Sequence, residues 1–253
     1  MIYVTGDTHG DFFRFSQEEF PEQKDMTEDD FVIVCGDFGI WNNTTEERDK
    51  FEFLLSLPFT ILFVDGNHEN FDRLYGDEFP LVSFHGGKAH KIQRNVYHLC
   101  RGYVFTLENK KFFTFGGAQS HDIRDGILDP ADFPYREKFL DEYYNWYVTG
   151  KQFRVLGQSW WPQELPSDEE MEFGLKTLRE NDNKVDYIIT HCCPQELASY
   201  FSRGMYEPDI LTKYFDTINK TVNFGHWYFG HYHNSERFFD RYTMLYYDME
   251  RIL

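Results

Sequence analysis

The stretch IYVTGDTHG, residues 2–10, decides the fold. It begins with β-branched and aromatic residues, which favour a strand, and its polar part lies between Gly6 and Gly10, which favour a tight loop. Asp7 and His9 stand two positions apart in that loop. On a near-extended segment, residues two apart point the same way, about 6.6 Å apart along the backbone. We therefore expect a strand that ends in two converging, metal-binding side chains.

An apolar run that ends in a polar cluster recurs three more times. The runs are FVIVC (31–35) before GDFG, TILFV (60–64) before DGNHE, and YIIT (187–190) before HCCP. Segments with helix character lie between them, at 12–20, 45–57, 167–181 and 208–219. Ser167 and Glu170 form a capping box at the start of the third segment. Strands that alternate with helices imply crossover connections and sheets buried on both faces.

Residues 82–116 have a different pattern, with five short β-rich pieces that indicate a run of hairpins and a turn at ENKK, 108–111. A further β-rich segment follows at 241–252. Together these features predict an α/β fold of four layers, in which two mixed β-sheets pack as a sandwich flanked by helices. We expect a single domain over residues 1–253, with an aromatic-rich helical insertion at 126–157.

The composition narrows the classes of partner. The formal net charge of -18 makes broad binding to nucleic acid or to an anionic membrane unfavourable, so a phosphorylated substrate must be attracted locally. The first strand leaves no room for a signal peptide, and no later stretch is apolar enough to span a membrane, so we expect a cytoplasmic protein. The four cysteines lack zinc-type spacing and are expected to be buried thiols: Cys35, Cys100, Cys192 and Cys193.

Seven side chains with metal-binding chemistry lie in the polar clusters. They are Asp7, His9, Asp37, Asn67, His191, His231 and His233. We expect them to converge, because ligands bind where the carboxyl ends of parallel strands meet. Carboxylates, imidazoles and one amide suit manganese, iron, zinc or magnesium better than copper. Seven ligands are too many for one ion, and a carboxylate such as Asp37 can bridge two ions about 3.5 to 4 Å apart.

Charge counting connects this centre to phosphate chemistry. Two divalent ions against two carboxylates leave a charge of about +2, or about +1 with a bridging hydroxide. Such a centre lets an acidic protein capture a phosphate. It also generates a nucleophile from water at neutral pH and stabilises charge on the phosphoryl oxygens.

Five motifs occur in a fixed order between Asp7 and His233: GDTHG, GDFG, GNHE, THCCP and GHYH. In this order they resemble the signature of the calcineurin-like metallophosphoesterase superfamily. The stretches GGAQSHD (116–122) and SWWPQE (159–164) also resemble a bacterial and phage subgroup of that superfamily. The resemblance therefore covers nearly the whole chain.

The resemblance implies how the ligands are divided. One ion is held by Asp7, His9 and His233, the second by Asn67, His191 and His231, and Asp37 bridges them. Manganese or iron is expected first, with zinc or magnesium as alternatives. His68 is implied to face the substrate as a general acid or as a donor to the phosphoryl oxygen.

The sequence departs from the serine/threonine phosphoprotein phosphatase branch. There the second motif continues with Asp-Arg-Gly and an Arg precedes GNHE, whereas here the second motif reads GDFGIWNN and Val64 and Asp65 precede Gly66. The phosphate-clamping arginines of that branch are absent at matching positions, and so is the acid that orients the histidine, for which Glu69 is a candidate replacement.

The predicted function is hydrolysis of a phosphate mono- or diester by a metal-bridging hydroxide, with His68 assisting. A serine/threonine protein phosphatase is one alternative. A non-catalytic module that binds phosphate or a nucleotide through its metal ions is the other. The sequence leaves the oligomeric state and the identity of the substrate open.

Residues after the glycine pair Gly116 and Gly117 are candidates for the substrate pocket, because glycines let a backbone approach a ligand closely. These candidates are His121, Asp122 and Arg124. A guanidinium suits phosphate binding, and the other arginines considered for this role are Arg14, Arg73 and Arg237.

The remaining histidines and the tryptophan pair receive structural interpretations. His226 would break the spacing offered by His231 and His233, so we exclude it as a ligand. The histidines of the hairpin region are expected to be surface or cross-strand pairing residues: His85, His90 and His98. Trp160 and Trp161 favour core or lid packing, with stacking on a nucleotide base as the alternative.

Overall fold

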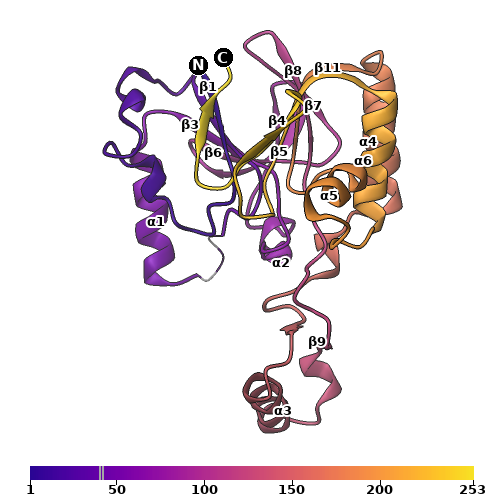
Figure 1. Ribbon diagram of the computed structural model, residues 1–253. Coiled ribbons are helices and arrows are strands. Elements are labelled where there is room, and N and C mark those ends of the chain that lie inside the picture. Colours follow the sequence, from indigo (N-terminus) through magenta and orange to yellow (C-terminus); the bar gives the residue numbers. More distant parts are fainter. Residues whose placement is uncertain (40, 42) are drawn as a thin grey trace.

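The computed structural model describes residues 1–39, 41 and 43–253 and contains two large mixed β-sheets packed face to face (Figure 1). The seven-stranded sheet has, in spatial order, β15 (Met249–Arg251), β1 (Ile2–Thr5), β2 (Phe31–Val34), β3 (Thr60–Phe63), β6 (Val96–Leu99), β5 (Gly87–Gln93) and β4 (Leu81–Phe84). The six-stranded sheet has β13 (Glu236–Phe238), β14 (Tyr242–Met244), β12 (Asn223–Phe229), β11 (Lys184–Thr190), β8 (Lys110–Phe115) and β7 (Val104–Leu107). The predicted α/β sandwich is confirmed.

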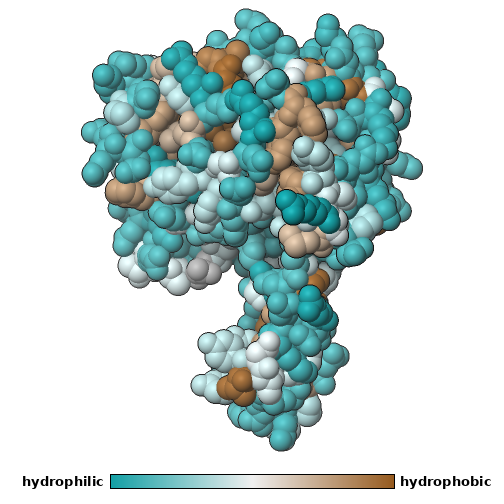
Figure 2. Space-filling view, in the orientation of Figure 1, coloured by the Kyte–Doolittle hydropathy of each residue, from teal (hydrophilic) through white to brown (hydrophobic). Residues whose placement is uncertain are grey.

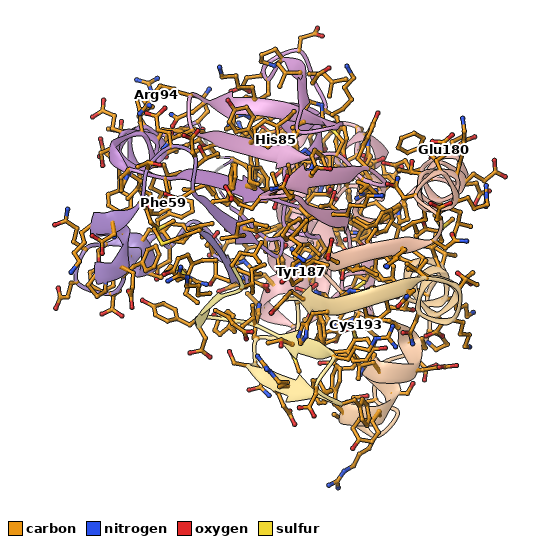
Figure 3. The ribbon with its side chains drawn as sticks, turned by 90° about the horizontal axis from the view of Figure 1, so that it is seen from above. Phe59, His85, Arg94, Glu180, Tyr187 and Cys193 are labelled. Carbon is orange, nitrogen blue, oxygen red and sulfur yellow. The ribbon has the colours of Figure 1, made fainter. Side chains whose placement is uncertain are left out.

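Apolar side chains fill three layers. Ile2 and Val4 of β1 point into the core between the sheets, whereas Tyr3 points into the core on the outer face. Successive side chains of the strand thus point to opposite faces of the sheet, and both faces are buried. This explains why the strands are continuous apolar runs in the sequence. Figure 3 shows the layers from above, with Phe59 in one outer core, Tyr187 between the sheets and Cys193 in the other outer core.

Helices cover the outer faces of the sandwich (Figure 1). α1 (Thr45–Ser56) covers one face, and α4 (Asp168–Glu180), α5 (Gln195–Ser202) and α6 (Ile210–Thr221) cover the other, whereas the short α2 (Phe71–Leu74) lies at the end of the body near the arm. The predicted capping box of Ser167 and Glu170 is present at the start of α4. All four cysteines, which lie within the described residues, are free thiols, and Cys100 is the least buried of them. Among the described residues, no helix is long and apolar enough to cross a membrane.

The expected helix at 12–20 is wrong. The segment contains the 3-10 turn η1 (Phe13–Phe15), and a second turn, η2 (Pro21–Asp25), follows it. Pro21 disfavours helical backbone at the residue before it. The buried Gln23 side chain donates hydrogen bonds to the carbonyls of Phe15 (2.9 Å) and Phe20 (2.9 Å), which fixes the irregular path.

The predicted run of hairpins is divided between the two sheets. Strands β4, β5 and β6 form an antiparallel meander in the first sheet, and β6 then pairs in parallel with β3. Strands β7 and β8 form a hairpin in the second sheet, with Glu108 and Asn109 in left-handed conformations at the predicted ENKK turn. The closing segment divides in the same way, because β14 and β15 belong to different sheets.

A projecting segment, which we call the arm, extends from the end of the body opposite the two termini (Figure 1). It comprises β9 (Gly126–Leu128), the 3-10 turn η3 (Pro130–Asp132), α3 (Arg136–Val148) and β10 (Phe153–Val155). Strands β9 and β10 pair in parallel, and Leu128, Phe139 and Val155 form a small core of their own. Figure 2 shows a predominantly hydrophilic surface over the body and the arm.

Candidate metal centre

Polar loops from both sheets meet at one end of the sandwich. Strands β1, β2 and β3 run parallel in one sheet, and β11 and β12 run parallel in the other. Their carboxyl ends therefore point the same way, and the loop after each strand carries part of the predicted ligand set. The structure brings these side chains within reach of one another.

Four of the seven side chains form a tight cluster: Asp7, His9, Asp37 and His233, with ligand atoms all within 4.8 Å of one another. His9 Nε2 lies 3.0 Å from His233 Nε2, and His233 Nε2 lies 3.3 Å from Asp7 Oδ2. We call this group the loop cluster. Each of the four side chains offers a nitrogen or oxygen atom that can bind a metal ion.

The other three side chains lie on the far side of Asp37. His191 Nε2 is 3.3 Å from Asp37 Oδ2 and 3.3 Å from Asn67 Oδ1. The rings of His191 and His231 have centroids 4.9 Å apart. Because Asp37 Oδ2 is also 3.7 Å from His9 Nε2, its carboxylate lies between the two groups.

The loop backbone differs from the near-extended path expected at Asp7 and His9. His9, Asp37, His231 and His233 all have left-handed φ angles, of 46°, 48°, 71° and 50°. The expectation fails because the loops bond to one another, with His9 N–H donating to the Asp37 carbonyl at 2.7 Å. Non-glycine residues rarely adopt this conformation, and it aims the side chains by a turn rather than by strand alternation.

Two motif glycines make room for the carboxylates. A Cβ atom on Gly66 would lie 2.0 Å from Asp37 Oδ1, and one on Gly230 would lie 2.0 Å from Asp7 Oδ1. Neither distance is compatible with a side chain. The glycines of GNHE and GHYH therefore allow the backbone to pack directly against the carboxylates.

The charges of the centre are unbalanced without cations. Asp7 and Asp37 are each only 1% exposed. Burial lowers the pKa of His191, but the Asp37 and Asp7 carboxylates outweigh it and raise that pKa to about 10. Burial raises the pKa of Asp37, but the charge of His191 outweighs it and the net pKa is well below the usual range. Such a buried carboxylate set fits divalent cations, which supply the missing charge.

An arginine from the arm lies against His68. Arg154 Nη1 is 3.0 Å from His68 Nδ1, and Arg154 Nη2 is 3.2 Å from His68 Nε2. The two ring nitrogens point in opposite directions, so a guanidinium this close to both lies on the face of the ring. Asp122 holds it there with two bonds of 2.7 Å, from Arg154 Nε and Nη2. Burial lowers the pKa of His68, and the Arg154 charge adds to that effect against the opposing Asp37 carboxylate.

A pocket of about 270 Å³ opens beside the loop cluster. Its walls include His9 and His68 from the loops, Arg154 from the arm, and the rings of Trp41 and Trp161. The pocket therefore combines two imidazoles and a guanidinium at the point where the arm joins the body. A phosphoryl group fits this chemistry.

A family model described as calcineurin-like phosphoesterase matches residues 1–235. The chain belongs to this family. The resemblance seen in the five motifs is confirmed at this level, and family membership indicates a metal-dependent phosphoester hydrolase. No curated protein matches the sequence significantly. The narrower assignment to a bacterial and phage subgroup stays a prediction.

The stretches GGAQSHD and SWWPQE support the candidate metal centre through hydrogen bonds to Asn67. Asn67 Nδ2 donates to Ser120 Oγ at 3.2 Å, and Ser120 Oγ donates to Glu164 Oε2 at 2.5 Å. These two hydrogen bonds fix the Asn67 amide so that its oxygen faces His191. Ser120 and Glu164 were not among the predicted site residues, although the GGAQSHD and SWWPQE stretches that contain them were a visible signal.

The predicted substrate residues take different positions. His121 Nε2 lies 3.4 Å from His231 Nε2, so it borders the centre, and Asp122 acts through Arg154. Arg124 is exposed, and among the described residues no ion pair of its side chain is found. Arg154 was missed, because nothing in the local sequence of the arm indicates that it reaches His68.

The other candidate arginines are engaged elsewhere. Arg14 donates to the backbone carbonyls of Asp7 (2.7 Å) and Tyr246 (2.6 Å). Arg73 pairs with Glu47 and Glu78, and Arg237 pairs with Glu250. Among the described residues, Arg154 is the arginine that lines the pocket beside His68.

Glu69 does not orient His68. Its carboxylate accepts hydrogen bonds from the Phe38 N–H at 2.8 Å and from the Trp41 indole, and it is fully buried. Burial raises its pKa to about 8, and the Asp37 charge acts in the same direction. Glu69 thus holds the loop after β2 in place.

Proposed function

We propose that this protein hydrolyses a phosphate mono- or diester with two divalent metal ions. Manganese and iron are the preferred candidates for these ions. The observation that supports this most is the Asp37 carboxylate between two groups of metal ligands. One ion would be held by Asp7, His9 and His233, the other by Asn67, His191 and His231, with Asp37 shared. When bound, such ions supply a hydroxide nucleophile at neutral pH and neutralise the phosphoryl oxygens.

The chain's own contribution to the reaction centres on His68. Its backbone N–H donates to Asp37 Oδ1 at 2.9 Å, which ties the imidazole to the shared carboxylate. We assign His68 the role of donating a proton or hydrogen bond to a phosphoryl or leaving-group oxygen. Arg154 binds the phosphoryl group and is held in place by Asp122.

This proposal is tested with two small esters. Protein stripped with a chelator is supplemented with manganese, iron, zinc or magnesium and assayed on p-nitrophenyl phosphate and on bis(p-nitrophenyl) phosphate. We expect turnover of at least one ester that depends on added metal. The better ester distinguishes a monoesterase from a diesterase, and a phosphoserine peptide assayed in parallel tests the protein phosphatase alternative.

A matched pair of variants controls the assay. Asp37→Asn removes the shared carboxylate, whereas His226→Asn removes an imidazole on β12 that bonds to Thr243 at 2.8 Å, away from the loop cluster. We expect only the first to abolish turnover. If wild-type protein binds metal stoichiometrically but hydrolyses neither ester nor the peptide, the binding-module alternative replaces the proposal.

A further inference from the structure

A second group of metal-ligand atoms lies on the strands of the first sheet, and the proposed function does not use it. It consists of His90 on β5, His98 on β6 and Cys100 just after β6, with ligand atoms within 4.8 Å of one another. We call it the strand cluster. His90 and His98 were expected to be surface or pairing residues, and they do pair across the strands, but they are 7% and 0% exposed.

Strand geometry fixes these three side chains. His90 and His98 are direct partners in the antiparallel register of β5 and β6. Cys100 follows His98 by two residues, so it projects from the same face as His98. His90 Nδ1 lies 3.0 Å from His98 Nδ1 and 3.8 Å from Cys100 Sγ.

Both distances from His90 Nδ1 are compatible with a single tetrahedral ion. With metal–nitrogen bonds of about 2.0–2.1 Å and a metal–sulfur bond of about 2.3 Å, such an ion separates two nitrogens by about 3.3 Å and a nitrogen from a sulfur by about 3.6 Å. The observed separations lie within a few tenths of an ångström of these values. Two imidazoles and a thiolate are ligands for a borderline ion such as zinc.

Hydrogen bonds at His98 Nε2 leave the lone pair of the ring on Nδ1, which faces the cluster. Arg101 donates to Asp65 Oδ2 from Nε at 2.9 Å and from Nη2 at 2.5 Å, so Asp65 is held as a carboxylate that can only accept. His98 Nε2 lies 3.0 Å from Asp65 Oδ1 and therefore carries the proton. In the neutral ring the lone pair is then on Nδ1, which faces His90. A carboxylate behind a histidine is the usual support of a metal ligand.

An opening lies close to the strand cluster. The Tyr75 ring packs edge-on against both imidazoles, with centroids 5.3 Å from His90 and 5.8 Å from His98. Tyr75 is 40% exposed and lines a pocket of about 340 Å³ together with Arg101 and Glu170. Tyr75 therefore contacts both the strand cluster and this pocket.

We propose that His90, His98 and Cys100 form a separate zinc-type metal site, with the fourth position open to water. The alternative is a metal-free arrangement in which the two imidazoles share a proton next to a thiol. The two differ in one measurable property, because only the metal site contains a bond between the ion and Cys100 sulfur.

Cobalt(II) reports on that bond. Full-length protein is stripped with a chelator and titrated with cobalt(II), and the near-ultraviolet thiolate-to-cobalt charge-transfer band is recorded. We expect the band in wild-type protein and its displacement by zinc. The band should persist in Asp37→Asn, which damages the loop cluster, and in Cys193→Ser, which replaces another buried thiol. It should be lost in Cys100→Ser.

Two further measurements keep the test decisive if Cys100→Ser fails to fold. His90→Gln should lower the affinity for cobalt by at least about tenfold, because even outer-shell partners contribute this much. In wild-type protein, zinc should protect Cys100 from alkylation, as measured on the peptide by mass spectrometry. Absence of the band in wild-type protein, its presence in Cys100→Ser or its loss in Asp37→Asn would each overturn the proposal.

Discussion

The loop cluster and the strand cluster each place two imidazole nitrogens 3.0 Å apart, but they achieve it in different ways. The loop cluster joins residues as distant as His9 and His233, carried on turns with left-handed backbone. The strand cluster joins residues within 87–100, placed by the register of one hairpin.

The two clusters also differ in the chemistry of their ligands and in their exposure. Carboxylates accompany the imidazoles in the loop cluster, whereas a thiol accompanies them in the strand cluster. In the loop cluster, the side chains of His9 and His233 are 32% and 51% exposed, and His9 lines a pocket, but His98 in the strand cluster has no exposure at all. The loop cluster therefore combines exposed imidazoles with carboxylates from loops of both sheets, whereas the strand cluster lies within one sheet and is more deeply buried.

The largest effect is expected from Asp37→Asn in the loop cluster. Removing the carboxylate shared by both ligand groups should lower turnover of the better ester by roughly 1,000-fold or more, because metal ions contribute several kcal/mol to charge stabilisation. Steady-state kinetics with added manganese measures the loss. Retention of more than about a tenth of the activity would show that Asp37 is not shared between two ions.

Arg101→Met tests the ion pair behind the strand cluster. It leaves the fully buried Asp65 without its guanidinium, and losing one partner of a buried pair costs about 3–5 kcal/mol. Urea unfolding measures the change in the free energy of unfolding. Arg94→Met is the control, because the Arg94 side chain is 51% exposed in its pair with Glu28 and should change stability by less than about 1 kcal/mol.

His68→Ala separates catalysis from metal binding within the loop cluster. The kcat should fall by about 100-fold, the lower range for a lost proton donor. Metal content, measured by elemental analysis, should not change. If the metal is lost together with activity, His68 serves the centre as a structural neighbour of Asn67 instead.

Arg154→Ala tests the contribution of the arm to the loop cluster. We expect kcat/KM to fall by about tenfold, because a hydrogen bond to a charged group contributes about 1.5 kcal/mol or more. Arg154→Lys should recover only part of the loss, since it keeps the charge but not the planar face against His68. The exposed Arg124→Ala is the control, and an equal loss there would argue for general electrostatic attraction.

The smallest effect is expected from Cys100→Ser. If the two clusters are independent, ester turnover should change by less than about twofold, as for separate sites whose effects add. The same preparations used for the cobalt titration serve for the kinetic assay. A proportional loss of the cobalt band and of turnover would show that the strand cluster supports catalysis through Asp65 and the loop that carries Asn67.

The sequence predicts the sandwich and the convergence of the loops well, because each ligand follows an apolar run that is recognisable as a buried strand. It does not predict which sheet each strand joins, since β6 and β7 have similar composition and lie in different sheets. The left-handed turns at His9 and His231 depend on bonds between loops that are distant in sequence.

The contact of Arg154 with His68 and the burial of His98 could not be predicted from the sequence, because both depend on tertiary packing. The arm places Arg154 against a residue 86 positions away, and no periodicity reports such a contact. His98 has no exposure because its sheet is covered on both faces, which the alternation of a single hairpin does not reveal.

The crowding at Gly66 and Gly230 has a consequence for tolerance to mutation. Random mutagenesis followed by selection for an active enzyme should retain these two glycines as strictly as the histidines beside them, because any larger residue would displace a carboxylate. Some of the least replaceable positions of the molecule would then be ones that bind nothing. These glycines contribute by lacking a side chain, which leaves room for the oxygen atoms of Asp37 and Asp7.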